Sequence, residues 1–223
     1  MTSVPDVLHR LRKKARRASL AGMARYGISA GGRLGVSVPD MRAIAKEIGT
    51  NHRLALALWK TGIGEARQVA AMIDDPLRVT ERQMESWVAD FDSWDLCDGV
   101  CLNLFEKTRF ARRKIRQWAA RDEEFVRRAA FSMMACLAWH DRGARAESFL
   151  VFFPLLERAA TDERNFVKKA VNWAIETSVR GTPSSIEPRS ASPGGSGRPA
   201  RAPHDGSPRT RSGSSRAKPC KSG

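Results

Sequence analysis

Residues 119–130 read Ala-Ala-Arg-Asp-Glu-Glu-Phe-Val-Arg-Arg-Ala-Ala, and residues 160–171 read Ala-Thr-Asp-Glu-Arg-Asn-Phe-Val-Lys-Lys-Ala-Val. The second stretch follows the first by 41 residues, and the Phe-Val-basic-basic-Ala segment keeps its register. A weaker copy lies at residues 65–71. A period near 40 residues with two helices per unit is typical of HEAT-like solenoids. The repeat therefore predicts an all-α fold, an α-α superhelix of the HEAT-like or ARM type.

The rest of the chain up to about Ser178 has the same helical pattern. Val, Ile and Thr never alternate with polar residues over a stretch long enough to indicate a sheet. Pro39 suits the first turn of a helix, and Ser37 is in place to cap it. The expected helices are residues 5–26, 39–48, 53–60, 65–73, 81–91, 94–105, 111–121, 124–139, 146–160 and 165–178.

The charge of the chain is strongly positive, +15 over 223 residues. Such a balance favours polyanionic partners, nucleic acid first and an anionic membrane surface second. Of the 43 residues from 181 to 223, 24 are Gly, Ser or Pro, so this segment buries too little apolar surface to offset its ordering entropy. We therefore expect one domain, residues 1–178, followed by a disordered basic tail, residues 179–223.

The four cysteines, Cys97, Cys101, Cys136 and Cys220, form no Cys-x-x-Cys pair and have no nearby His. Neither a metal site nor a disulfide framework is indicated. Cys97 and Cys101 lie on the apolar face of their helix, which suits small core residues. No apolar run reaches the roughly 18 residues that span a membrane, and the N-terminus lacks a secretory signal. We expect no membrane and no metal, and a location in the bacterial cytosol or nucleoid.

Basic pairs recur at equivalent positions of the repeat, Arg127 with Arg128 and Lys168 with Lys169. Equivalent positions of a solenoid line up along one surface, and a line of cations suits a phosphate backbone. Each pair taken alone also fits an ordinary solvated helix face. Their repetition in register favours DNA as the partner.

A second basic cluster lies at residues 109–116 and includes Arg113 and Lys114. It adds five cations within eight residues, and together with the repeated pairs it favours nucleic acid over a solvated helix face. We add Arg113 and Lys114 to the candidate DNA-binding residues.

A different kind of pattern lies at residues 93–98, Ser-Trp-Asp-Leu-Cys-Asp. Trp94 and Asp98 are four residues apart, which on a helix places an indole and a carboxylate on one face. They lie at the edge of the apolar stripe of that helix. An aromatic ring beside an acid at the rim of a core suits a cationic reaction centre. The same spacing also fits a core tryptophan beside a solvated acid.

Four stretches together resemble the bacterial DNA alkylation repair family, the HEAT-like-repeat DNA glycosylases. They occur in the order that this family shows and span about residues 20–176. The stretches are Gly35–Ala45, Glu65–Arg67 with Asp74–Pro76, Ser93–Asp98, and Phe166–Trp173.

The resemblance implies roles for individual residues. Asp98 matches the catalytic acid of the family, Trp94 and Trp173 match its two site tryptophans, and Arg128 matches a DNA-contacting arginine. It implies a monofunctional glycosylase that hydrolyses the N-glycosidic bond of cationic alkylpurines, such as 3-alkyladenine and 7-alkylguanine, in duplex DNA. The product is an abasic site, the lesion stays in the base stack, and no cofactor is required. We expect a monomer whose partner is duplex DNA containing alkylated bases.

The chemistry suits these residue types. Departure of a cationic purine leaves an oxocarbenium-like sugar, which a carboxylate at Asp98 stabilises while it orients the attacking water. The indole faces of Trp94 and Trp173 attract a cation, although Trp173 alone also fits a core position. Arg128 would hold a phosphate next to the lesion. Two other classes stay open: a non-catalytic helical-repeat protein specific for DNA structure, and a HEAT protein-interaction scaffold.

The resemblance ends where the composition changes, after about Ser178. The family's solenoid continues with further helices, whereas this chain turns into the Ser/Pro/Gly/Arg segment. Natural truncation or a shifted reading frame is a hypothesis that resequencing of the 3′ end tests. We expect the last helix pair to expose apolar surface if its cap is missing.

Overall fold

The computed structural model describes residues 2–28, 31–140 and 147–180. These residues contain helices and no strand, which confirms the all-α class, and they belong to one compact unit, Met1–Ser185. No helix among them is long and apolar enough to cross a membrane. The elements are α1 (Val4–Lys14), α2 (Arg17–Met23), η1 (Ala24–Tyr26), α3 (Val38–Ile48), α4 (His52–Trp59), α5 (Gly64–Ile73), α6 (Glu81–Ala89), α7 (Trp94–Asn103), η2 (Phe105–Lys107), α8 (Ala111–Trp118), α9 (Glu124–His140), α10 (Glu147–Leu150), α11 (Phe153–Ala159) and α12 (Asn165–Arg180).

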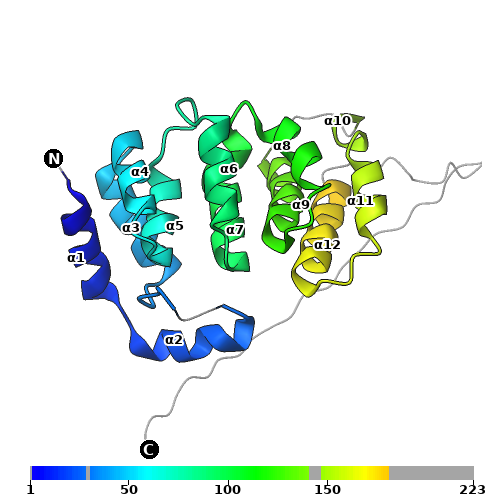
Figure 1. Cartoon of the computed structure of the whole chain (residues 1–223). Coiled ribbons are helices and arrows are strands. Elements are labelled where there is room, and N and C mark those ends of the chain that lie inside the picture. Colours follow the sequence, from blue (N-terminus) through cyan, green and yellow to red (C-terminus); the bar gives the residue numbers. More distant parts are fainter. Residues whose placement is uncertain (1, 29–30, 141–146, 181–223) are drawn as a thin grey trace, which may run out of the picture. The chain divides into compact units, whose positions relative to one another are not determined.

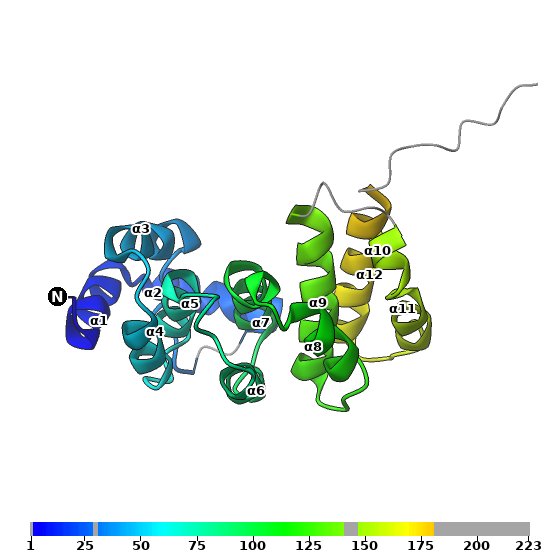
Figure 2. The same ribbon diagram turned by 90° about the horizontal axis from the view of Figure 1, so that it is seen from above.

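The helices stack in two rows (Figures 1 and 2). In the inner row α5, α7, α9 and α12 follow one another, and each packs against the next. Helices α4, α6 and α8 form the outer row, while α11 packs against α12 (Figure 2). The short helix α2 lies across the ends of α5 and α7 (Figure 1). This two-row stacking is the arrangement that the 41-residue repeat predicts.

The repeat is visible as the packing of α9 against α12. Phe125 and Phe166 occupy equivalent positions, and their rings lie 5.4 Å apart. Val126 and Val167, which follow them, are both buried. The Phe-Val pair therefore packs the inner helices of neighbouring units against each other.

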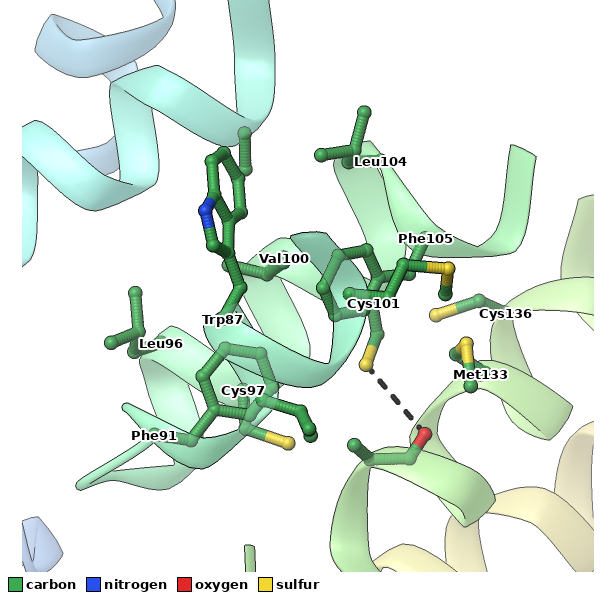
Figure 3. Close-up of a cluster of buried hydrophobic side chains, with 14 of the residues drawn as sticks. Trp87, Phe91, Leu96, Cys97, Val100, Cys101, Leu104, Phe105, Met133 and Cys136 are labelled. Atoms are coloured by element: carbon green, nitrogen blue, oxygen red, sulfur yellow. Dashed lines mark hydrogen bonds between the residues drawn. The ribbon is translucent and has the colours of Figure 1, made fainter. Parts of the chain in front are cut away.

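The buried core between α6, α7 and α9 contains three of the cysteines (Figure 3). Cys97 and Cys101 are fully buried, and each thiol donates a hydrogen bond of 3.6 Å to a main-chain carbonyl of α9. Burial raises the pKa of the Cys101 thiol, and it raises the pKa of Cys136 as well, so both stay protonated and unreactive. The core role expected for Cys97 and Cys101 is confirmed, while Cys220 lies outside the described residues.

The loop before α3 is held by one buried carboxylate. Glu65 is 1% exposed and accepts hydrogen bonds of 2.7–3.3 Å from the main-chain amides of Leu34, Gly35 and Val36. These amides belong to no helix, so the carboxylate supplies the partners that the loop lacks. The loop is thereby fixed against α5.

Arg33, in the same loop, fixes the start of α7. Its buried guanidinium forms a bidentate ion pair with Asp95 at 2.7 and 3.0 Å. It also donates to the hydroxyl of Ser93 at 2.5 Å. Because Trp94 lies between these two partners, Arg33 positions the first turn of α7.

Two residues of the stretches that carry the family resemblance, Arg67 and Asp74, also connect helices. Arg67 lies 5.1 Å above the ring of Trp59. Asp74, which is buried, forms hydrogen bonds with His52 at 2.5 Å and with Gln83 at 2.6 Å. Arg67 thus joins α5 to α4, and Asp74 joins the end of α5 to α4 and α6.

The expected helix over residues 5–26 is wrong in its extent, because α1 ends at Lys14. Ala15 adopts an extended backbone, with φ −63° and ψ 137°. The carbonyl of Arg16 then packs against Gly35, where an added Cβ would lie 2.4 Å from the carbonyl oxygen. This tertiary contact, which leaves no local signal, separates α1 from α2.

The expected helix over residues 146–160 is also divided, into α10 and α11. Pro154 lies in the first turn of α11, where its missing amide proton is not needed. The other helices begin and end within three residues of their expected bounds. Helix α12 continues to Arg180, and the rest of the expected tail lies outside the described residues.

We predict that Gly35→Ala destabilises the protein more than Gly62→Ala. Both glycines have positive φ, 76° and 70°, so each substitution costs about 1–2 kcal/mol of backbone strain. Only at Gly35 does the added Cβ also meet backbone, at the Arg16 carbonyl. Urea unfolding of both variants measures the difference, and equal losses of stability would contradict this packing.

Candidate functional site

One pocket brings together all three expected catalytic residues. It has a volume of about 460 Å³ and lies among the N-terminal halves of α7, α9 and α12, beside η1. Its walls include Trp94, Asp98 and Trp173, together with the expected DNA-binding residues Arg128 and Lys169. The structure therefore collects residues that lie up to 79 positions apart in the sequence.

The carboxylate of Asp98 is held on both oxygens. Arg128 donates from Nε to Oδ1 at 3.0 Å and from Nη2 to Oδ2 at 2.7 Å. Ser132 donates to Oδ1 at 2.7 Å. A carboxylate has about four acceptor positions, so one remains on Oδ2. The side chain keeps 21% of its surface exposed, and the remaining position is available to a water or ligand in the pocket.

Arg128 is the central cation of this arrangement. Its side chain is 6% exposed, and besides Asp98 it bonds the main-chain carbonyl of Phe166 in α12. Burial acts to lower the pKa of Arg128, but the hydrogen bonds and charge of Asp98 outweigh it and the pKa is raised. Three of its five N–H donors are used within the protein. The phosphate contact expected for Arg128 would depend on the other two.

The two tryptophans are half-buried and line the pocket. The indole N–H of Trp94 donates to the main-chain carbonyl of Tyr26 at 2.8 Å, which fixes the ring under η1. Trp173 packs against the apolar core on one side. Neither indole is enclosed in the core, so both can contact a ligand in the pocket.

The lysines of the repeat are exposed on α12, and Lys169 lines the pocket. Lys168 lies beside it outside the pocket. The second basic residues of the two repeat copies, Arg128 and Lys169, thus meet in one place.

Arg127 differs from its repeat partner, Lys168, because its guanidinium forms an ion pair with an acidic side chain. Its guanidinium pairs with Asp162 at 2.8 Å and donates to the carbonyl of Arg121 at 2.7 Å. It braces the turn before α12 and does not extend a line of exposed cations. The expected DNA-binding role of Arg127 stays a prediction, and such a contact would share the guanidinium with Asp162.

Lys114, another expected DNA-binding residue, is paired within the fold, and its role in DNA binding stays a prediction. Its side chain is 4% exposed, and the ammonium lies 2.6 Å from Glu85 and 2.9 Å from Gln117. It is on the face of α8 that packs toward α6, so its charge is neutralised inside the fold. Its neighbour Arg113 stays 53% exposed and pairs with Glu81. Neither residue lines the pocket.

Sequence reasoning missed several residues of the pocket. Arg25, Tyr26, Asn165 and Phe166 line it, and only the three-dimensional path of the chain brings the first two there. Ser132 left a local signal, since it follows Arg128 by four residues within an otherwise apolar run.

Comparisons with known proteins give the family and the fold of the chain. The family model of the DNA alkylation repair enzymes matches residues 7–183, and the chain belongs to this family.

A solved structure with a TM-score of 0.70 shares 22% identity, covering 79% of this chain and 75% of its own. It is described as a new family of proteins related to the HEAT-like repeat DNA glycosylases with affinity for branched DNA structures. The likeness confirms the HEAT-like fold. No curated protein matches the chain.

We predict that Ser132→Ala lowers the free energy of unfolding by about 1.5–3 kcal/mol, since Asp98 loses a buried, charge-assisted hydrogen bond. Ser86→Ala is the matched control, because Ser86 is exposed on α6. Chemical denaturation of the two variants tests the difference. If both unfold at the same urea concentration, Ser132 does not support the carboxylate.

A pH-dependent prediction concerns Asp162. Hydrogen bonds from Arg164 lower its pKa most, burial opposes them, and Arg127 adds to the lowering. A carboxyl whose pKa is lower in the folded state stabilises the protein above its unfolded pKa, near 3.9, and loses this contribution as the pH falls. Asp162→Asn should therefore destabilise the protein at neutral pH, and its difference from wild type should shrink below about pH 4. Unfolding curves across pH measure this, and a constant difference would contradict it.

Proposed function

We propose that this protein is a monofunctional DNA glycosylase that releases cationic alkylpurines from duplex DNA. Its substrates would be bases such as 3-alkyladenine and 7-alkylguanine, and its product an abasic site. Asp98, Trp94 and Trp173 would form the catalytic set, with Arg128, Lys169 and Lys168 toward the DNA. We further propose that the protein is a monomer and that it acts on DNA in the cytosol.

The observation that carries the proposal is a carboxylate held rigidly at the wall of a pocket between two indoles. Charge that develops in a transition state is best stabilised by groups that are already oriented. The bidentate pair with Arg128 and the bond from Ser132 prevent Asp98 from rotating. Its remaining acceptor position can face a cationic sugar or receive a proton from the attacking water.

The leaving group explains why so few residues suffice. A purine with a formal positive charge departs as a neutral base, so no general acid is needed to protonate it. The charge then moves to the sugar, where Asp98 is stabilising. Indole faces at Trp94 and Trp173 contribute about 0.5–2 kcal/mol each toward a cation, depending on desolvation.

Cations at the pocket rim suit the phosphates on either side of a lesion. Arg25 and Lys169 both line the pocket and are exposed. Such contacts fix the register of DNA without reading its sequence. The carboxylate in the pocket therefore matches the positive charge that develops on the sugar, and the cations at the rim match the negative charge of the phosphate backbone.

A second candidate function is recognition of DNA structure without base excision. The observation in its favour is the solved neighbour, which is described by its affinity for branched DNA. A binder of this kind has no need of the held carboxylate, and this argues for the glycosylase. A protein-interaction scaffold, the third class, does not account for the basic rim.

The deciding experiment measures release of 7-methylguanine from methylated duplex DNA. We expect release by wild type and a loss of about 10²–10³-fold in rate for Asp98→Asn, the magnitude typical of removing one oriented charge-stabilising group. Glu163→Gln is the matched control, since Glu163 is exposed and does not line the pocket. Circular dichroism and duplex binding establish that each variant is folded.

The opposite results separate the candidates. A folded protein that binds DNA but releases no base contradicts the glycosylase. If that protein also binds a four-way junction more tightly than a linear duplex, the structure-specific binder is supported instead. Equal rates for wild type and Asp98→Asn would remove Asp98 from the catalytic role.

A further inference from the structure

Outside the pocket, the cations of residues 109–116 lie over aromatic rings. Four guanidinium groups lie 4.8–5.7 Å from the centre of a phenylalanine ring. Arg109 and Arg113 lie over Phe110, Arg112 over Phe149, and Arg116 over Phe152. We call these four arginines the α8 arginine surface.

Such contacts are unusually dense here. Significant cation–π pairs occur about once per 70–80 residues, whereas this segment has four within eight residues. A ring attracts a guanidinium through the negative face of its π-system and carries no net charge of its own. The rings therefore order these cations without neutralising them.

Acids balance only part of this charge. Glu81 pairs with Arg113, and within the part of the chain that the structure describes no Asp or Glu pairs with Arg109 or Arg116. Both of these arginines are exposed. The rings beneath them, Phe110 and Phe152, are partly and fully buried, so the surface has a firm base.

The α8 arginine surface is separate from the pocket, to which α8 contributes no residue. Helix α8 packs along α9 and reaches it through the short connection 119–123, so the two helices run in opposite directions. Arg109 thus lies toward the end of α9 that is far from Arg128. Figure 1 shows α8 on the side opposite α2, and Arg25 and Tyr26 of η1, which follows α2, line the pocket.

We propose that the α8 arginine surface binds the phosphate backbone of duplex DNA at a place outside the pocket. Arginine presents a planar fork of donors that matches phosphate oxygens in pairs. Helix α8 rises about 7.5 Å from Ala111 to Arg116, which along the duplex axis matches about two phosphates of one strand, and Arg109 lies in the turn just before the helix. This inference requires that DNA is the partner, but it does not require base excision.

The test compares two double variants of equal charge. Arg109→Gln with Arg116→Gln removes two cations from the surface, and Arg53→Gln with Arg78→Gln removes two exposed cations elsewhere. Binding of unmodified duplex is measured over a range of salt. We expect the slope of log K against log salt to become shallower by about 2 for the first variant, with about tenfold or greater loss of affinity at low salt. The second variant should keep a slope close to that of wild type.

Equal slopes for the two double variants would overturn the proposal, as would a loss of binding to anionic lipid vesicles with duplex binding unchanged. If the double variant does not fold, Arg109→Gln alone should lower the slope by about 1. Asp98→Asn separates this inference from the proposed function. If the double variant Arg109→Gln with Arg116→Gln has a shallower salt slope but releases base at the normal rate, neither the enzyme nor the surface is overturned. If wild type releases no base while the same double variant still has a shallower slope, only the enzyme is overturned.

Discussion

The rest of the site depends on the hydrogen bonds that the guanidinium of Arg128 donates. It connects three neighbouring inner helices, through Asp98 in α7 and the carbonyl of Phe166 in α12. Removing it would leave a carboxylate at a pocket wall with one hydrogen-bond partner, Ser132. A partly buried acid in that state is costly, and its orientation is no longer fixed. The same pair therefore contributes to the packing of the helices and to the geometry of the candidate catalytic acid.

The residues of the pocket and of the loops that support it divide into two groups. Glu65 and Arg33 hold the loop before α3, and Arg33 continues to Asp95 at the start of α7. These contacts determine where α7 begins, and so where Trp94 and Asp98 stand. The first group is a scaffold made of the hydrogen bonds of Glu65 and the ion pair of Arg33 with Asp95, and the second is the site that this scaffold supports. The basic α8 arginine surface belongs to neither group.

The sequence predicts the fold because the repeat is periodic. It predicts that Trp94 and Asp98 lie together because residues four positions apart on a helix share a face. The pocket partner Trp173 required the family resemblance. Charge alone did not separate Lys169, which lines the pocket, from Arg127, which is paired with an acid on another element. That distinction depends on which distant carboxylate each cation meets. The division of the first helix from α2 has the same origin, because it follows from a long-range backbone contact.

The central claim is that the held carboxylate of Asp98 faces a cationic sugar, and a binding measurement tests it most directly. Two duplexes are compared, one with a protonated pyrrolidine in place of a single sugar and one with a neutral tetrahydrofuran at the same position. Wild type should bind the cationic duplex at least about tenfold more tightly, as expected for a transition-state mimic, and Asp98→Asn should lose most of this preference, keeping only the part that the two indoles contribute. The same preference for the cation in both proteins would contradict the account.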